Sequence, residues 1–173
     1  GRIKLTEDQI DRIMLWSTVG LILGARIFDV VFWEYSYFLK HPLEIFVIWN
    51  GGLSFHGGLT GIVVAVVLLC KKYKIKLLEL ADIMAAPLAL GQTFGRLGNF
   101  FNGELYGLPT KLSWGINFGN EIDILGNPVF RHPNQLYEAI YDIIIFVVLW
   151  KLKDKKLPTG SILAIFLIMY SIF

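Results

Sequence analysis

The densest group of side chains that could carry out chemistry lies between Gly95 and Gly107. This stretch contains Arg96, Asn99 and Glu104 together with four glycines. A guanidinium group presents five N–H donors in a planar fork, which suits a phosphodiester. The asparagine can hydrogen-bond glycerol oxygens or backbone, and the carboxylate can hold the arginine in place or accept a proton. The structural alternative is an Arg–Glu pair that caps the end of a helix.

His56 is the second candidate for a functional side chain. It is one of three histidines in the chain and precedes two consecutive glycines, where neighbouring backbone can approach closely. The alternative is a packing role, because Gly57 and Gly61 have the small-xxx-small spacing of a helix–helix contact. His56 would then be a hydrogen-bonded histidine at that interface.

A third group follows Pro133 and includes Gln135, Tyr137 and Glu138. One interpretation is a helix start, because proline suits the first turn and a glutamate near that end complements the helix dipole. The other interpretation is that these side chains line one cavity with the two groups above. Both interpretations place them near the beginning of a helix.

The elements that must hold these side chains are apolar helices. Hydrophobic residues make up 55% of the 173 residues and charged residues only 17%, against roughly 25% charged residues in soluble domains. A helix needs roughly 17–25 residues to cross the hydrocarbon core of a membrane. We therefore predict an all-α polytopic membrane protein, a helical bundle with spans at about 13–33, 53–70, 77–94, 135–151 and 161–173.

The two ends of the sequence are abrupt. The last apolar run, 161–173, has only thirteen residues, and the chain opens with glycine rather than methionine. We expect a single integral-membrane domain over residues 1–173 that is cut at both ends from a longer protein, with its fifth span truncated.

Two charged residues, Arg26 and Asp29, lie deep in the first predicted span. Charges at that depth are costly and normally face the protein interior. They indicate either an ion pair at i,i+3 or an arginine that faces a polar cavity. Glu79 and Asp82 lie close to a lysine run, so we expect them near the membrane–water interface.

Lysines in the connections predict the orientation of the spans. Lysine-rich segments at 71–76 and 151–156 are placed in the cytoplasm by the positive-inside rule. Residues 96–135 then lie outside, and this segment is too polar for lipid and too long for a turn. Its glycines and prolines break regular structure. We predict a small outer-face cap of short strands and turns, inserted between spans three and four.

Charge and cysteine content exclude other classes. The net charge of +2 is too balanced for an electrostatically driven nucleic-acid binder. The single cysteine, Cys70, excludes a disulfide framework and any Cys-based metal site within the chain.

Three stretches of the chain resemble the prolipoprotein diacylglyceryl transferase family. They are residues 50–58 around His56, residues 95–107 and residues 131–138. The second carries the family signature G-R-x-G-N-F-x-N-x-E-x-x-G, and all its fixed positions match. The family has seven spans, so the resemblance implies one helix before Gly1 and a last helix that continues past Phe173 and carries an arginine implicated in activity.

The resemblance implies an enzyme, a transferase. It would move the diacylglyceryl group of phosphatidylglycerol to the lipobox cysteine thiol in the signal peptide of a prolipoprotein, the first step of lipoprotein maturation. A thioether forms and glycerol phosphate leaves. The implied location is the bacterial plasma (inner) membrane, multi-pass, with the active site toward the outer face and membrane lipid around it. No cofactor, metal or nucleic acid is implied.

The resemblance also suggests roles for individual residues. Arg96 would be catalytic by binding the lipid phosphate and stabilising the leaving group, and Asn99 and Glu104 would position the phosphate and the glyceryl group. His56 is the candidate base for the thiol, since imidazole titrates near pH 6.5. The expected substrate-binding residues are Arg96, Asn99, Glu104, Arg26 and Tyr137.

Two other classes compete with this interpretation. A small transporter or channel would use Arg26, Asp29 and Asp82 as pathway charges, but a transporter concentrates polar residues near the membrane midplane. Here most of them lie at the outer boundary and in the predicted cap. A purely structural membrane scaffold is the other alternative, and the density of Arg, Asn and Glu in one segment argues against it.

Overall fold

The computed structural model describes residues 3 and 5–172, and within them it shows helices and irregular connections but no β-strand. The chain divides into two compact units, Gly1–Leu77 and Leu78–Phe173. Three helices in the described residues are long and apolar enough to cross a membrane, namely Glu7–Trp33, Phe55–Tyr73 and Leu77–Asn102. The predicted all-α membrane fold is confirmed.

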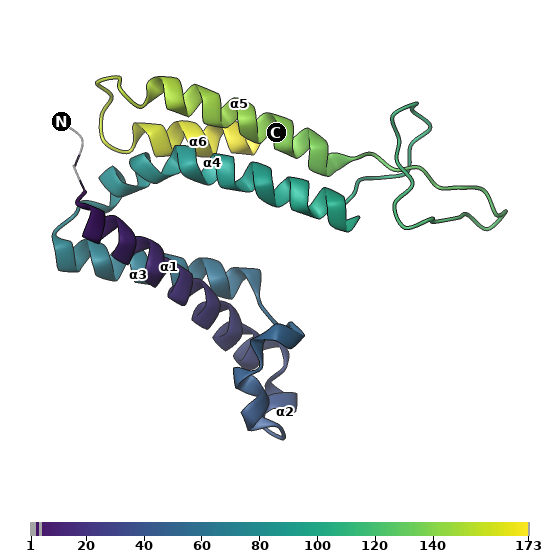
Figure 1. The fold of residues 1–173 in the computed structure, drawn as a ribbon, viewed down its shortest axis with the longest axis horizontal. Helices are drawn as coiled ribbons and strands as arrows, with labels where there is room; N and C mark the ends of the chain where they lie inside the picture. The colour runs from purple at the N-terminus through teal and green to yellow at the C-terminus, as the bar shows by residue number, and fades with distance from the viewer. Residues whose placement is uncertain (1–2, 4, 173) are drawn as a thin grey trace. The chain divides into compact units, whose positions relative to one another are not determined.

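The first unit is built on two long helices (Figure 1). Its elements are α1 (Glu7–Phe28) with a π-helical turn at Asp29–Trp33, the short α2 (Tyr35–Phe38), 3₁₀ turns at Pro42–Phe46 and Ile48–Asn50, and α3 (Phe55–Tyr73). The side chain of Thr6 caps α1 by accepting from the backbone N–H of Gln9. The side chain of Ser54 caps α3 in the same way, from the N–H of Gly57. Each long helix therefore begins at a hydroxyl residue that satisfies an otherwise unpaired donor.

The backbones of α1 and α3 meet at glycines. A Cβ atom added to Gly20 would lie 2.6 Å from the carbonyl oxygen of Gly61, and one added to Gly24 would lie 2.8 Å from the Cα of Gly61. A Cβ atom added to Gly57 would likewise collide with the carbonyl oxygen of Gly24. The predicted small-xxx-small packing is confirmed, because only residues without a side chain permit this approach.

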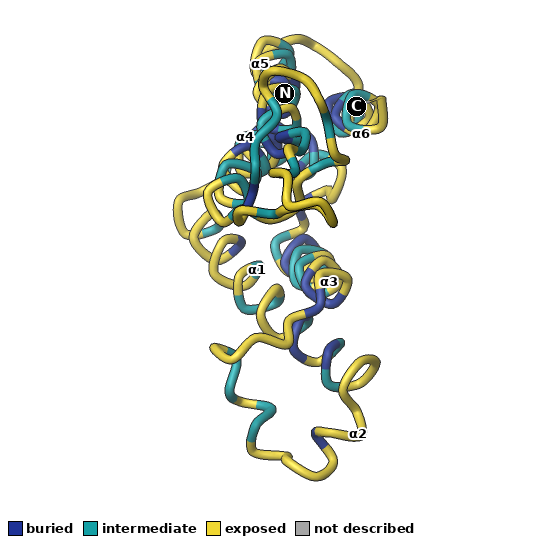
Figure 2. The backbone as a smooth tube through the Cα atoms, turned by 90° about the vertical axis from the view of Figure 1, so that its right-hand side faces the viewer, coloured by how far each residue is buried: buried dark blue, intermediate teal, exposed yellow. Residues whose placement is uncertain are grey.

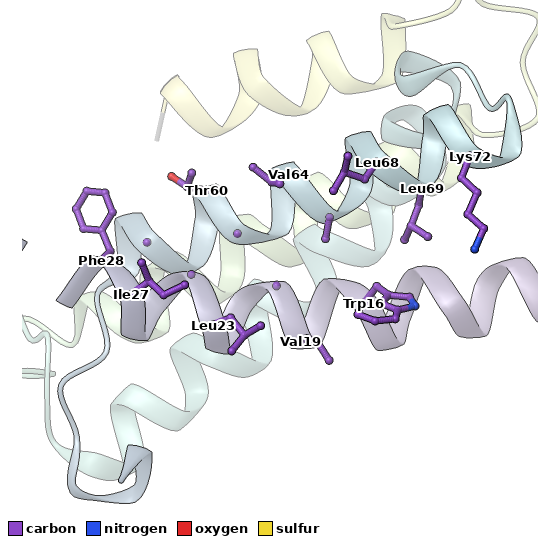
Figure 3. Close-up of a pocket in the computed structure, with 15 residues that line it drawn as sticks. Trp16, Val19, Leu23, Ile27, Phe28, Thr60, Val64, Leu68, Leu69 and Lys72 are labelled. Atoms are coloured by element: carbon purple, nitrogen blue, oxygen red, sulfur yellow. The ribbon is translucent and has the colours of Figure 1, made fainter. Parts of the chain in front are cut away.

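A groove of about 490 Å³ runs along the same helix pair (Figure 3). Its lining is apolar apart from Thr60 and Lys72, and the labelled side chains run from Phe28 at one end to Lys72 at the other. Most of the surface of α1 and α3 is exposed (Figure 2). Exposed apolar side chains on these helices, such as Leu23 and Val64, agree with a surface that faces lipid.

The second unit consists of α4 (Leu77–Asn102), α5 (Asn134–Leu152) and α6 (Ser161–Ile172), which lie side by side (Figure 1). Their shared core contains small residues of α4 and large apolar residues of α5 and α6. Its buried members are Ala85, Ala86, Ala89, Ile145, Leu149, Ile162 and Phe166. The larger side chains of α5 and α6 fill the space beside the small side chains of α4.

Asp82 connects α4 to the beginning of α6. Its Oδ2 accepts from the backbone N–H of Gly160 at 2.7 Å and its Oδ1 from that of Leu163 at 2.8 Å. The residue is 8% exposed, and a carboxylate at a helix N-terminus also complements the helix dipole. Both oxygens are therefore used in structure, which disfavours Asp82 as a pathway charge of a transporter.

We expect Asp82→Ala to lower the free energy of unfolding by about 2 kcal/mol, the upper range for loss of a helix cap. Two N–H groups at the start of α6 would lose their acceptor. Thermal unfolding in detergent measures the change. Asp154→Ala, in the exposed connection after α5, is the control and should leave the transition unchanged. Equal stability of the Asp82 variant and the parent protein would contradict the capping role.

The segment between α4 and α5 differs from its prediction in two ways. Helix α4 continues to Asn102, so Arg96 and Asn99 lie on the helix and not in the connecting segment. The helix ends at Gly103, the first residue there with a positive φ, +66°. The expected short strands are isolated bridges, which pair Pro109 with Arg131, Ile116 with Arg131 and Ile122 with Pro128.

Candidate active site

Arg96 faces α5 and forms an ion pair with Glu138. The contact joins Arg96 Nε to Glu138 Oε2, and the two side chains are 28% and 27% exposed. The terminal Nη1 and Nη2 groups of Arg96 make no hydrogen bond to any described residue. The helix therefore presents a fixed guanidinium whose outer donors are available for an anion.

Glu104, which the sequence offered as a partner for Arg96, bonds elsewhere. Its Oε1 accepts from Asn99 Nδ2 at 2.8 Å and from Asn102 Nδ2 at 3.3 Å. The hydrogen bond from Asn99, followed by that from Asn102, lowers the pKa of Glu104 below its usual value. This carboxylate is therefore held ionised at the end of α4, where it fixes the two asparagines.

Gln135 connects residues 131–138 to the signature segment, residues 95–107. Its Nε2 donates to the backbone oxygen of Glu104 at 2.6 Å, and the residue is 1% exposed. The beginning of α5 is thereby tied to the end of α4. Residues 95–107 and 131–138 therefore meet here.

Tyr137 points to the connecting segment. Its hydroxyl accepts from Trp114 Nε1 at 2.8 Å and lies 3.2 Å from His132 Nδ1. The tyrosine is 38% exposed, so it lies at the edge of this polar region and ties the connection to α5.

Arg26, in the first unit, is fully engaged by backbone carbonyls. Its five N–H groups donate to the oxygens of Ile45, Gly51, Gly52, Glu44 and Val47 at 2.6–3.3 Å. Nη1 is also 3.6 Å from Asp29 Oδ2, and the guanidinium lies over the ring of Phe38. It borders a pocket of about 300 Å³ that also includes Glu34. Arg26 therefore organises the 42–52 loop. Its contact with Asp29, one of the two interpretations from the sequence, is part of that arrangement.

His56 occupies the first turn of α3, also in the first unit. Its side chain is exposed and its ring contacts that of Phe55 edge to face at 5.8 Å. The interface role considered from the sequence belongs to the neighbouring glycines, because Gly57 and Gly58 are buried.

Asp142 of α5 is a buried acidic residue that sequence analysis did not single out. It is 1% exposed and lies four residues after Glu138 on the same face of α5. It interacts electrostatically with Arg96 and Glu138. The signal was present in the sequence, because Gln135, Glu138 and Asp142 have helical spacing within an apolar run, and an acidic residue inside such a run normally has a function.

The connecting segment is stabilised by an ion pair between Arg131 and Glu121. Arg131 Nε and Nη2 each lie 2.6 Å from a carboxylate oxygen of Glu121. These hydrogen bonds lower the pKa of Glu121 below its usual value of 4.5. Hydrogen bonds from Asn127 lower the pKa of Asp123 in the same way. A lowered pKa means that the folded segment is favoured when these groups are ionised.

We therefore expect the segment to keep its structure above about pH 4.5 and to loosen as the pH falls through the lower pKa values of the folded state. Hydrogen exchange of residues 108–131, corrected for its intrinsic pH dependence, measures this. Glu121→Gln should weaken the pH dependence, because one of the two shifted carboxylates is gone. Identical pH profiles for the variant and the parent protein would contradict the role of this ion pair.

Comparison with known proteins identifies the family. A family model described as prolipoprotein diacylglyceryl transferase matches residues 2–173. The chain belongs to the prolipoprotein diacylglyceryl transferase family. The resemblance inferred from the signature is thus confirmed, and the residues of the signature are those that gather at the α4–α5 contact in the structure.

Three relatives carry the name phosphatidylglycerol–prolipoprotein diacylglyceryl transferase. The protein of Oleidesulfovibrio alaskensis is 43% identical over 97% of this chain and 61% of its own length. Those of Nitratidesulfovibrio vulgaris strain DP4 and Geobacter sulfurreducens are each 41% identical, over 98% and 99% of this chain and 63% and 64% of their own lengths. The chain thus spans a little under two thirds of the relatives that it matches.

Proposed function

We propose that the protein transfers the diacylglyceryl group of phosphatidylglycerol to the lipobox cysteine of a prolipoprotein. The observation that carries this proposal is Arg96, which Glu138 anchors through Nε while both terminal nitrogens stay without a partner among the described residues. This arrangement suits a phosphodiester. The names of the relatives supply the two substrates.

The reaction sets two tasks for the protein. A thioether forms only if sulfur displaces the phosphate ester at the glyceryl carbon, so the carbon–oxygen bond breaks and the charge on the departing phosphate increases. A fixed guanidinium offsets that charge without reorganising during the reaction. The thiol must also lose its proton, because the thiolate is the nucleophile.

The remaining residues position these groups in the proposal. Asn99, held by Glu104, lies one turn from Arg96 and would orient the phosphate and the glyceryl group. Tyr137 would lie at the edge of the polar region around these residues. Arg26 would act indirectly, since its donors hold the 42–52 loop. The guanidinium of Arg96 has donors but no acceptor, so another residue must accept the thiol proton. The sequence offers His56 and the structure adds Asp142.

The proposed location is the bacterial plasma (inner) membrane, with several spans and the active site toward the outer face. The lysine-rich connections after α3 and after α5 would lie in the cytoplasm. The Asn102 end of α4 and the Asn134 end of α5 then lie outside, together with the segment between them. That segment would form the cap over the outer face.

The test uses the protein as its gene encodes it, in vesicles that contain labelled phosphatidylglycerol. A lipobox peptide is added, and the label on its cysteine is measured. Label that survives as a thioether supports the proposal. A peptide with serine in place of the cysteine is the control and should remain unlabelled. A transporter or scaffold would label neither peptide, and that result would refute the proposed activity.

A further inference from the structure

The contact between α4 and α5 changes character along its length. At the end nearer the α5–α6 connection it is apolar, where the alanines of α4 pack on Ile145 and Leu149. Toward the Asn134 end of α5 both helices carry polar residues. These polar residues are Gln92 and Arg96 of α4 with Gln135, Glu138 and Asp142 of α5. A polar seam therefore begins where the apolar core ends.

Asp142 is the deepest acidic residue of this seam. Its Oδ1 atom is buried and has no hydrogen-bond partner among the described residues. The buried oxygens Gln92 Oε1 and Gln135 Oε1 are also unsatisfied within the same part of the chain. Buried acceptors without donors are unfavourable in a static structure. Each such acceptor needs an explanation, and a donor that arrives with a ligand is one.

The position of Asp142 relative to Arg96 fits the S–H group of the substrate cysteine as this donor. At 1.5 Å per residue, Asp142 lies about 6 Å further along α5 than Glu138, the partner of Arg96. In the proposed orientation this direction leads toward the membrane interior, where the acyl chains of the lipid lie. The scissile bond is on that side of the phosphate, and sulfur must approach the carbon opposite the departing oxygen. The thiol therefore lies on the Asp142 side of the reacting carbon.

We propose that Asp142 is a catalytic residue that accepts the proton of the substrate thiol, an inference that rests on the proposed function. The S–H proton passes to Oδ1, and a sulfur electron pair forms the bond to carbon. The electron pair of the carbon–oxygen bond leaves with glycerol phosphate, held by Arg96. That phosphate, with a second pKa near 6, then takes the proton and restores the carboxylate.

The experiment compares two lipobox peptides that differ only in cysteine or selenocysteine. A selenol is far more acidic than a thiol and is ionised at neutral pH, so it needs no base. Asp142→Asn keeps the size of the side chain but removes the base. With the cysteine peptide we expect the transfer rate of Asp142→Asn to fall about 100-fold or more, the usual contribution of general base catalysis. With the selenocysteine peptide the rate should stay within about tenfold of the parent protein.

Three further variants separate base catalysis from other roles. Arg96→Lys should slow both peptides, because the phosphate is the same for each. Asp82→Asn alters another buried carboxylate of the second unit, and it should change both rates by the same factor. Asp142→Glu keeps a base and should retain more activity toward cysteine than Asp142→Asn. Correct folding of each variant is checked by its thermal transition.

Two results would overturn the inference. One is an equal loss with both peptides in Asp142→Asn, which would make Asp142 a structural partner of Arg96. The other is a selenium-rescued loss in His56→Asn but not in Asp142→Asn, which would assign the proton to His56. If the parent protein labels neither peptide, the proposed function itself fails. Transfer by the parent protein with full activity of Asp142→Asn would reject only the role of Asp142.

Discussion

Arg96→Lys is expected to reduce diacylglyceryl transfer about 100- to 1,000-fold, the usual effect of losing a fixed donor to a developing negative charge. Lysine keeps the positive charge but has one flexible ammonium group in place of a planar fork. It cannot bond Glu138 through one nitrogen while two others face the phosphate. The rate of labelling of a lipobox peptide at saturating phosphatidylglycerol measures the effect, because saturation separates catalysis from lipid binding.

The matched control for this variant is Arg131→Lys. Arg131 has the same side chain and also forms an ion pair with a glutamate, but its partner Glu121 lies in the same connecting segment. We expect less than about a tenfold change in transfer, because its N–H groups are already used within the protein. Comparable losses in the two variants would mean that either guanidinium matters equally and that Arg96 holds no special position.

Gly24→Leu is expected to disrupt the first unit. A side chain at this position would meet the carbonyl oxygen of Gly57 and the Cα of Gly61, which lies 2.8 Å from the added Cβ. Both neighbours are backbone, so they cannot move unless α1 and α3 separate. We expect a loss of about 3 kcal/mol in the free energy of unfolding, at the upper end for overpacking. Thermal unfolding in detergent and the yield of folded protein measure it.

Gly91→Leu is the control for that substitution. Gly91 is a helical glycine of α4, and a Cβ added there would meet no described atom within 4 Å outside its own stretch of helix. Leucine has a higher helix propensity than glycine, so this variant should be as stable as the parent protein or slightly more stable. A similar destabilisation at both positions would show that leucine harms any helix here and would contradict the glycine contact.

The sequence alone predicted the helices, the membrane environment and the family. These features depend on properties that lie next to each other along the chain, such as the length of an apolar run. The signature from Gly95 to Gly107 is also a local pattern, and it indicated Arg96 as a phosphate-binding residue. The end of α4 was placed too early, because Arg96 and Asn99 are polar but remain compatible with a helix until Gly103.

The tertiary structure decided which polar groups meet. It paired Arg96 with Glu138 instead of Glu104, and it showed that Asp82 caps α6. It also showed that Arg26 holds a loop through all five of its donors. Such contacts depend on which faces of distant helices pack together, and a pattern within one helix does not specify the facing residue. For the same reason, the burial of Asp142 was decided only by the packing of α5 in the second unit.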